Sequence, residues 1–224
     1  MYKGIINKIE ISVGILSSEW IKFKVGESEL SGLLEKPRTE TVLVVIILHP
    51  HPLYGGDMFN PVVHTLANAF LDSGYATFRF DFRGANSRSD FAGISGAVDD
   101  CAAASKMLNS LKFELAGIAG YSFGGSAALR FGSDNKAKFV VSVSSSLALI
   151  EEGGFQANQL SGIQCPVLMF HGTSDLTVPF ENMSKISFRI SSEVKCISLE
   201  NEGHFYHKSL DRVRTEVQEF IENL

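Results

Sequence analysis

From about residue 40 onward, short apolar runs alternate with segments of helical periodicity. Val42–Leu48 is a continuous run of β-branched residues and leucine between polar residues and a proline, which predicts a strand buried on both faces. Further apolar runs predict strands at Tyr75–Phe80, Leu115–Ala119, Phe139–Val143, Val167–Phe170 and Val194–Leu199. Apolar residues at helical spacing predict helices over 62–71, 98–111, about 123–132, 180–190 and 207–222. Such alternation indicates βαβ units and a mainly parallel sheet.

The segment that precedes this region, residues 19–36, alternates polar and apolar side chains with period two. This pattern predicts a half-exposed antiparallel hairpin at the start of the sheet. No internal repeat, low-complexity segment or linker divides the chain. We therefore expect residues 1–224 to form a single α/β domain, in which a mostly parallel central sheet has helices on both faces.

Charge and hydropathy exclude several classes of function. The chain has 20 basic and 25 acidic side chains and a net charge of −5, without a basic cluster, so we expect no binding to nucleic acid or to an anionic membrane. The longest apolar run, Val42–Leu48, is far shorter than the roughly 20 residues of a membrane helix. The N-terminus lacks the apolar stretch and the cleavage site of a secretory signal.

The number and spacing of the cysteines indicate a reducing compartment. The 3 cysteines, Cys101, Cys165 and Cys196, are far apart and form no CxxC pair, which predicts buried thiols rather than disulfides or a zinc site. We expect a cytoplasmic protein that is a monomer or a homodimer.

Gly120–Gly124 has the pattern G-x-S-x-G and follows the strand predicted at Leu115–Ala119. A helix is predicted to begin directly after it, which is the strand–turn–helix context of a nucleophile elbow centred on Ser122. The glycines leave room for the tight turn, and the first N–H groups of the helix are free to bind an oxyanion. The alternative is a serine that only caps a helix.

Two further side chains lie where a serine nucleophile needs them. Asp175 follows the strand predicted at Val167–Phe170, and His204 follows the strand predicted at Val194–Leu199. Because the carboxyl ends of parallel strands meet at one edge of a sheet, Ser122, Asp175 and His204 are expected to lie close together. They form a candidate triad of nucleophile, acid and base in the chain order Ser, Asp, His.

Two alternatives to this triad remain open. His207 lies one turn past His204 on the predicted terminal helix and is the rival base. Glu151 and Glu152 follow the strand predicted at Phe139–Val143, which is a second position for the acid.

These motifs together resemble the α/β-hydrolase superfamily. Within it, Leu48–Gly56 (LHPHPLYGG) and Phe80–Gly84 (FDFRG) resemble small cap-less bacterial hydrolases related to dienelactone hydrolase. The resemblance covers roughly residues 25–222. One departure is that Asn86-Ser87-Arg88 stands where such proteins usually have Gly-x-Ser, in a loop near the site.

The resemblance implies an α/β-hydrolase fold and a serine hydrolase without a cofactor. Superfamily members with large lids insert them after the strand that follows the elbow helix, but here residues 144–165 leave room only for a short helix. We therefore expect no large cap domain.

In the superfamily, a second oxyanion donor follows the first buried strand. The prolines on either side of His51 have no N–H, so the His51 amide is the expected donor, with Leu53 or Tyr54 as alternatives. The other expected donor is the Phe123 amide. His49 and His51 also suggest a metal site, but no carboxylate or thiol lies nearby in the sequence, so we expect no metal.

The expected reaction is hydrolysis of small to medium carboxylic esters, thioesters or lactones through an acyl-enzyme on Ser122. Tyr54, Phe205 and Tyr206 are expected to line an open aromatic cleft for this small-molecule ester. A peptidase is one alternative. Another is a catalytically slow binding or receptor protein on the same scaffold, although a pure binder has no need of a complete triad.

Overall fold

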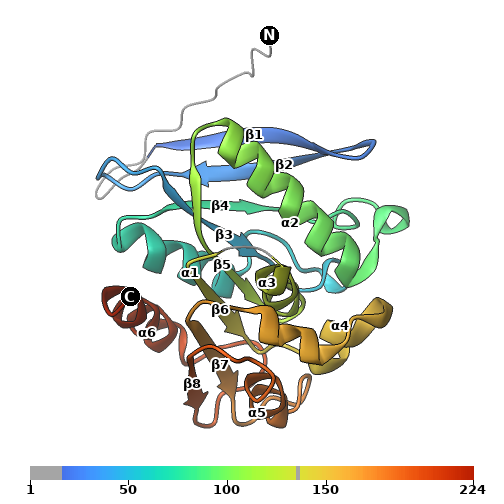
Figure 1. Cartoon of the computed structure of the whole chain (residues 1–224), viewed down its shortest axis with the longest axis vertical. Helices are drawn as coiled ribbons and strands as arrows, with labels where there is room; N and C mark the ends of the chain where they lie inside the picture. The colour runs from blue at the N-terminus through green and yellow to red at the C-terminus, as the bar shows by residue number, and fades with distance from the viewer. Residues whose placement is uncertain (1–16, 135–136) are drawn as a thin grey trace.

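The computed structural model describes residues 17–134 and 137–224 (Figure 1). The N-terminal residues that lack the features of a secretory signal lie outside them. The described residues form an eight-stranded sheet with the strand order β1-β2-β4-β3-β5-β6-β7-β8. The strands are β1 Ser18–Val25, β2 Ser28–Glu35, β3 Leu43–Leu48, β4 Ala76–Phe80, β5 Glu114–Tyr121, β6 Phe139–Val143, β7 Val167–Gly172 and β8 Val194–Leu199.

The sheet is antiparallel only at its N-terminal side. β1 pairs antiparallel with β2, and β2 pairs antiparallel with β4. From β4 to β8 every neighbouring pair is parallel. The predicted fold class, a mostly parallel sheet that starts with an antiparallel hairpin, is confirmed.

Helices cover both faces of this sheet (Figure 1). They are α1 Pro61–Asp72, α2 Gly93–Ser110, α3 Phe123–Asp134, α4 Leu147–Glu151, α5 Glu181–Ser187 and α6 Leu210–Glu222, with short 3-10 turns at Pro52–Tyr54, Arg88–Asp90, Glu152–Gly154 and Ala157–Gly162. α1 and α6 pack on one face, and α2 and α3 pack on the other. None of the helices in the described residues has the length and apolar character that crossing a membrane requires.

β3 shows why a strand at the centre of such a sheet is apolar at every position. Val44, Ile46 and Leu48 belong to the core under α2 and α3, whereas Val45 and Ile47 belong to the core under α1 and α6. Successive side chains of a strand point to opposite faces, so both sets are needed when both faces are covered. Each of these side chains contributes about 1.5–3 kcal/mol by burial.

Three predictions about local structure need correction. α2 begins at Gly93 rather than at residue 98, and the Glu152 Oε1 atom lies 3.4 Å from the Ile94 N–H at its start. The glycines of this first turn have low helix propensity and concealed it in the sequence. α6 begins at Leu210, so His207 lies in the preceding loop. Cys196 is exposed because β8 is an edge strand.

The segment between β6 and β7 holds only α4 and two short 3-10 turns. The expectation that no large cap is inserted after β6 is therefore confirmed.

Candidate active site

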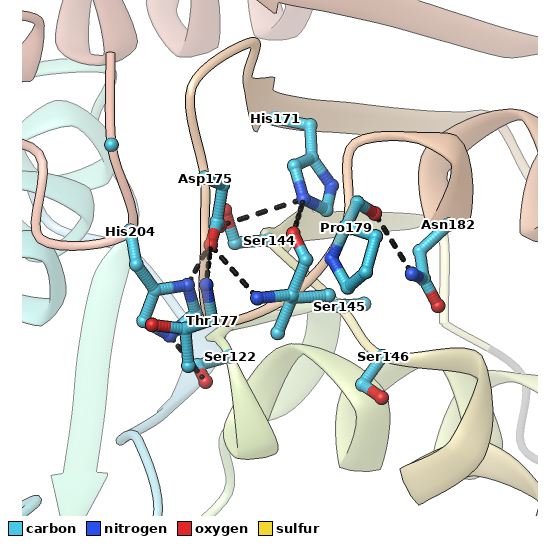
Figure 2. A network of polar contacts seen from close by, with 12 residues as sticks. Ser122, Ser144, Ser145, Ser146, His171, Asp175, Thr177, Pro179, Asn182 and His204 are labelled. Carbon is cyan, nitrogen blue, oxygen red and sulfur yellow. Dashed lines mark hydrogen bonds and ion pairs between the residues drawn. The ribbon is translucent and has the colours of Figure 1, made fainter.

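Four strands, β3, β5, β7 and β8, end at the same edge of the sheet, and the loops that follow them carry the candidate residues. Ser122 follows β5, Asp175 lies in the loop after β7, and His204 lies in the loop after β8. Figure 2 shows these three side chains converging at this edge.

Ser122 occupies the sharp turn between β5 and α3. Its φ is +56°, in the left-handed region that non-glycine residues rarely adopt, and its N–H donates to the Val143 carbonyl at 2.7 Å. A Cβ added to Gly120 would lie 2.2 Å from the Gly124 carbonyl oxygen, and one added to Gly124 would lie 2.3 Å from that of Leu48. Both glycines are therefore required by the close packing around this turn.

The three candidate residues form a continuous hydrogen-bonded chain. The Ser122 Oγ atom lies 3.0 Å from His204 Nε2, and His204 Nδ1 lies 2.7 Å from Asp175 Oδ2. All three residues are buried, with exposed fractions of 6–8%. This arrangement lets the imidazole accept the hydroxyl proton of Ser122 while Asp175 holds the ring in the matching tautomer.

The Asp175 carboxylate is also held by its own loop. Its Oδ1 atom accepts hydrogen bonds from the N–H groups of Thr177 and Val178, at 2.9 and 2.8 Å. Burial by itself raises the pKa of this carboxyl, but the hydrogen bonds from His204 and from the two amides outweigh it, so the pKa of Asp175 lies below its ordinary value. The acid is therefore ionised at neutral pH.

His171 contacts the other side of the same carboxylate (Figure 2). Its Nε2 atom lies 2.9 Å from the Val178 carbonyl oxygen and 3.5 Å from Asp175 Oδ2. Burial lowers the pKa of His171, so this ring is neutral at neutral pH. It packs against the loop that carries Asp175 without adding a charge.

The loop that carries His204 has two supports that the sequence patterns did not reveal. The Tyr121 hydroxyl donates to the His204 carbonyl at 2.5 Å, although the two residues lie far apart in the chain. The buried Glu202 carboxylate accepts from the N–H groups of Gly203 and Lys208 at 3.0 and 2.9 Å. The sequence signal for the second support is Glu202 itself, directly before Gly203 and His204. A carboxylate in a loop can accept hydrogen bonds from nearby backbone N–H groups and so fix the conformation of the loop.

The rival residues lie elsewhere. His207 is exposed, and its ring contacts Phe205 at 6.2 Å between centroids. Glu151 and Glu152 are also exposed, and the side chain of Glu152 contacts the Ile94 N–H at the start of α2. Among the described residues, the carboxylate that bonds the His204 ring is that of Asp175.

The loop after β3 distinguishes the candidate oxyanion donors. The Leu53 N–H donates to His51 Nδ1 at 3.2 Å, and the Tyr54 N–H donates to the His51 carbonyl at 3.1 Å, so both alternatives are occupied. Within the described part of the chain, no hydrogen bond joins the His51 N–H to another group. The His51 ring contacts the Phe123 ring at 4.8 Å between centroids, which places this loop against the start of α3.

The three residues predicted to bind substrate do not behave alike. Tyr54 is 87% exposed and its ring contacts that of His51, whereas Phe205 is 67% exposed and its ring contacts that of His204. Tyr206 is buried, and its hydroxyl lies 2.9 Å from Ser144 Oγ. The prediction that Tyr206 lines an open cleft is wrong, because its backbone has a φ of +53° and its side chain packs into the core.

No cluster of three or more His, Cys, Asp or Glu side chains in residues 17–134 and 137–224 is arranged to hold a metal ion. His49 precedes His51 in the His-Pro-His-Pro motif, and both nitrogens of its ring have backbone partners. Nδ1 pairs with the Pro50 carbonyl, and Nε2 pairs with the Phe82 N–H.

No family model matches the chain. A solved α/β serine hydrolase homologue from Coxiella burnetii is 30% identical, with a TM-score of 0.80 over 90% of this chain and 96% of that one.

Two more distant structures share the fold. A serine hydrolase without a lid from Xanthomonas campestris is 22% identical, with a TM-score of 0.77 over 92% of this chain and 94% of that one. A dienelactone hydrolase from Anabaena variabilis is 20% identical, with a TM-score of 0.75 over 93% and 98%.

Proposed function

Because this chain belongs to the α/β serine hydrolases, we propose that it hydrolyses small to medium carboxylic esters, thioesters or lactones through an acyl-enzyme on Ser122. The observation that carries the proposal is the continuous hydrogen-bonded chain from Ser122 through His204 to Asp175. A serine in a strained turn, an imidazole and a buried carboxylate in this order are the groups that acyl transfer requires.

In the first half of the proposed reaction, His204 Nε2 accepts the proton of Ser122 Oγ as the oxygen attacks the acyl carbonyl. The same imidazole then donates that proton to the departing alcohol or thiol. Asp175 stabilises the imidazolium without taking its proton. In the second half, water attacks the acyl group and His204 accepts a proton from the water. The imidazolium then returns this proton to Ser122 Oγ as the bond between Oγ and the acyl carbon breaks and the carboxylic acid leaves.

The negative charge on the carbonyl oxygen needs N–H donors. The Phe123 amide is the first N–H of α3, where helix geometry leaves it without an intrahelical partner. The His51 amide is the second proposed donor, because the neighbouring amides of Leu53 and Tyr54 are already bonded. Two such donors stabilise an oxyanion more than they stabilise the ground-state carbonyl.

The proposed substrate class follows from the surroundings of Ser122. Only short helices lie between β6 and β7, so this segment forms no cap domain that could enclose the long acyl chain of a lipid substrate. Tyr54, in contact with His51, and Phe205, in contact with His204, offer exposed apolar surface, which suits an ester with an apolar group of moderate size.

A panel of activated substrates tests this function. We expect the wild-type protein to turn over short and medium acyl esters, a thioester or a lactone, with a decline for long acyl chains. A protein that hydrolyses N-acyl peptide amides but none of the esters is instead a peptidase. Absence of turnover on the whole panel contradicts the proposal.

Tyr54→Ala and Phe205→Ala are each expected to raise KM for an aromatic ester by about fivefold to thirtyfold, because each removes a partner for the apolar group. The turnover number kcat should stay nearly unchanged, since neither side chain takes part in the hydrogen bonds that join Ser122, His204 and Asp175. Steady-state kinetics on one aromatic and one acetyl ester measure both constants. Phe188→Ala, which removes an equally exposed ring at the end of α5, is the matched control. Equal KM values for all three variants would contradict the assignment.

Asp175→Asn is expected to lower kcat by about 10⁴, because an amide favours the wrong imidazole tautomer at His204. Glu151→Gln and Glu152→Gln, which neutralise carboxylates after the preceding strand, should leave kcat within about twofold of the wild-type value. Steady-state kinetics of the three variants on one activated ester measure the difference. If a glutamate variant shows the large loss and Asp175→Asn does not, the acid lies after β6.

A further inference from the structure

His49, the first residue after β3, is a fully buried histidine outside the hydrogen-bonded chain of the triad. Its Nε2 atom lies 2.9 Å from the Phe82 backbone nitrogen, and its Nδ1 atom lies 2.6 Å from the Pro50 carbonyl oxygen. The ring therefore joins the loop after β3 to the loop after β4.

These two partners determine the protonation of the ring. Burial lowers the pKa of His49 to about 4, so the ring is neutral at neutral pH and carries one N–H. The Phe82 N–H is a donor and requires a free lone pair on Nε2. The proton therefore lies on Nδ1, which donates to the Pro50 carbonyl.

The Pro50 carbonyl belongs to the same peptide unit as the His51 N–H. A trans peptide is planar, so its C=O and its N–H point in opposite directions. The described residues contain no cis peptide bond. A hydrogen bond that fixes the direction of the Pro50 C=O therefore also fixes the direction of the His51 N–H.

This peptide unit lies next to the nucleophile. A Cβ added to Gly124 would lie 2.5 Å from the His49 carbonyl oxygen, so the backbone leading into the loop touches the first turn of α3. The His51 ring contacts the Phe123 ring at 4.8 Å between centroids. The His51 N–H and the Phe123 N–H are thus carried by backbone segments in contact, at the turn that holds Ser122.

We propose that His49 is a positioning residue: through the hydrogen bond from its Nδ1–H to the Pro50 carbonyl, it aims the His51 N–H at the oxyanion formed on Ser122. The inference rests on the proposed acyl-enzyme function. His49 does not touch the substrate, and it acts through the orientation of one peptide group. Loss of one oxyanion donor lowers kcat by about 10²–10³, which sets the expected effect of misdirecting the His51 N–H.

Two variants separate the two hydrogen bonds of the ring. In His49→Asn, the side-chain NH₂ replaces Nδ1–H and donates to Pro50, but Phe82 loses its acceptor. In His49→Gln, the side-chain carbonyl replaces Nε2 and accepts from Phe82, but Pro50 loses its donor. We expect His49→Gln to lower kcat by about 10²–10³ with KM changed less than about threefold. We expect His49→Asn to keep kcat within about tenfold of the wild-type value.

Thermal unfolding of both variants separates positioning from stability. His49→Asn leaves a buried backbone N–H without an acceptor, so it should be at least as destabilised as His49→Gln. If stability alone governed the activity, His49→Asn would then be the less active variant. Equal kcat values for the two variants, or a lower kcat for His49→Asn, would overturn the inference.

A measurement on the wild-type protein does not depend on whether the variants fold. The ¹⁵N NMR spectrum of the His49 ring at neutral pH should show the Nδ1–H tautomer, and an Nε2–H tautomer would overturn the inference. Wild-type turnover is measured on the same ester in the same series. A wild-type protein without turnover overturns the proposed function together with this inference, whereas wild-type turnover with an unaffected His49→Gln overturns this inference alone.

Discussion

Ser122→Ala is expected to lower kcat/KM for ester hydrolysis by about 10⁶ and to leave the fold intact. The variant removes the oxygen that attacks the acyl carbonyl, and no other hydroxyl in the described hydrogen bonds reaches His204 Nε2. Alanine fits the space of serine, although the left-handed backbone at this position is strained for either residue. Steady-state kinetics on the best ester of the panel, with circular dichroism of the variant, measure both outcomes.

Ser144→Ala is the matched control for this variant. Ser144 also follows a strand directly, is buried and has a positive φ, of +47°, but its hydroxyl contacts Tyr206 instead of His204. We expect it to lose about 1–3 kcal/mol of stability, because the Tyr206 hydroxyl loses its partner, and to retain turnover. A Ser122→Ala variant with a tenth of the wild-type activity would contradict the assignment of the nucleophile.

His204→Ala is expected to cost about as much as Ser122→Ala, about 10⁶ in kcat, because without a base the hydroxyl is not activated. In the wild-type protein, kcat/KM should rise with pH through a single ionisation and then level off, since only the neutral imidazole accepts the serine proton. Asp175 does not limit this rise, because its lowered pKa keeps it ionised at the pH values where imidazole titrates. The variant should lose this acid limb together with the activity.

His207→Ala is the control, since His207 lies in the same loop, is exposed and is the nearest other histidine in the sequence. Its pH–rate profile should match that of the wild-type protein. If His207→Ala loses the acid limb while His204→Ala retains it, the base is His207 and the hydrogen bond to Ser122 has no catalytic role.

The position of the candidate site was predictable from the sequence because strand ends in a parallel sheet share one edge. The apolar runs located β5, β7 and β8, and the first polar motifs after them contain Ser122, Asp175 and His204. The order of the strands did not need to be known for this step. The prediction of the site required only that the strands be parallel, and the helices predicted between them indicated that they are.

Details of the loops were not predictable in the same way. Tyr206 follows the exposed Phe205, and its side chain points inward because its own backbone is left-handed, with a φ of +53°, at a position for which the sequence has no glycine signal. The contact of the Tyr121 hydroxyl with the His204 carbonyl joins distant segments, so no local pattern records it. His49 resembled half of a metal site in the sequence, and only its backbone partners in the folded chain showed another role.

The central claim is that Ser122 is a nucleophile activated by His204. The most direct test is reaction with a fluorophosphonate, followed by mass spectrometry of the intact protein and of its peptides. The account predicts one adduct per chain, located on Ser122, and a labelling rate that falls by orders of magnitude in His204→Ala while His207→Ala labels as fast as the wild-type protein. An unlabelled wild-type protein, or an adduct on any other residue, would contradict it.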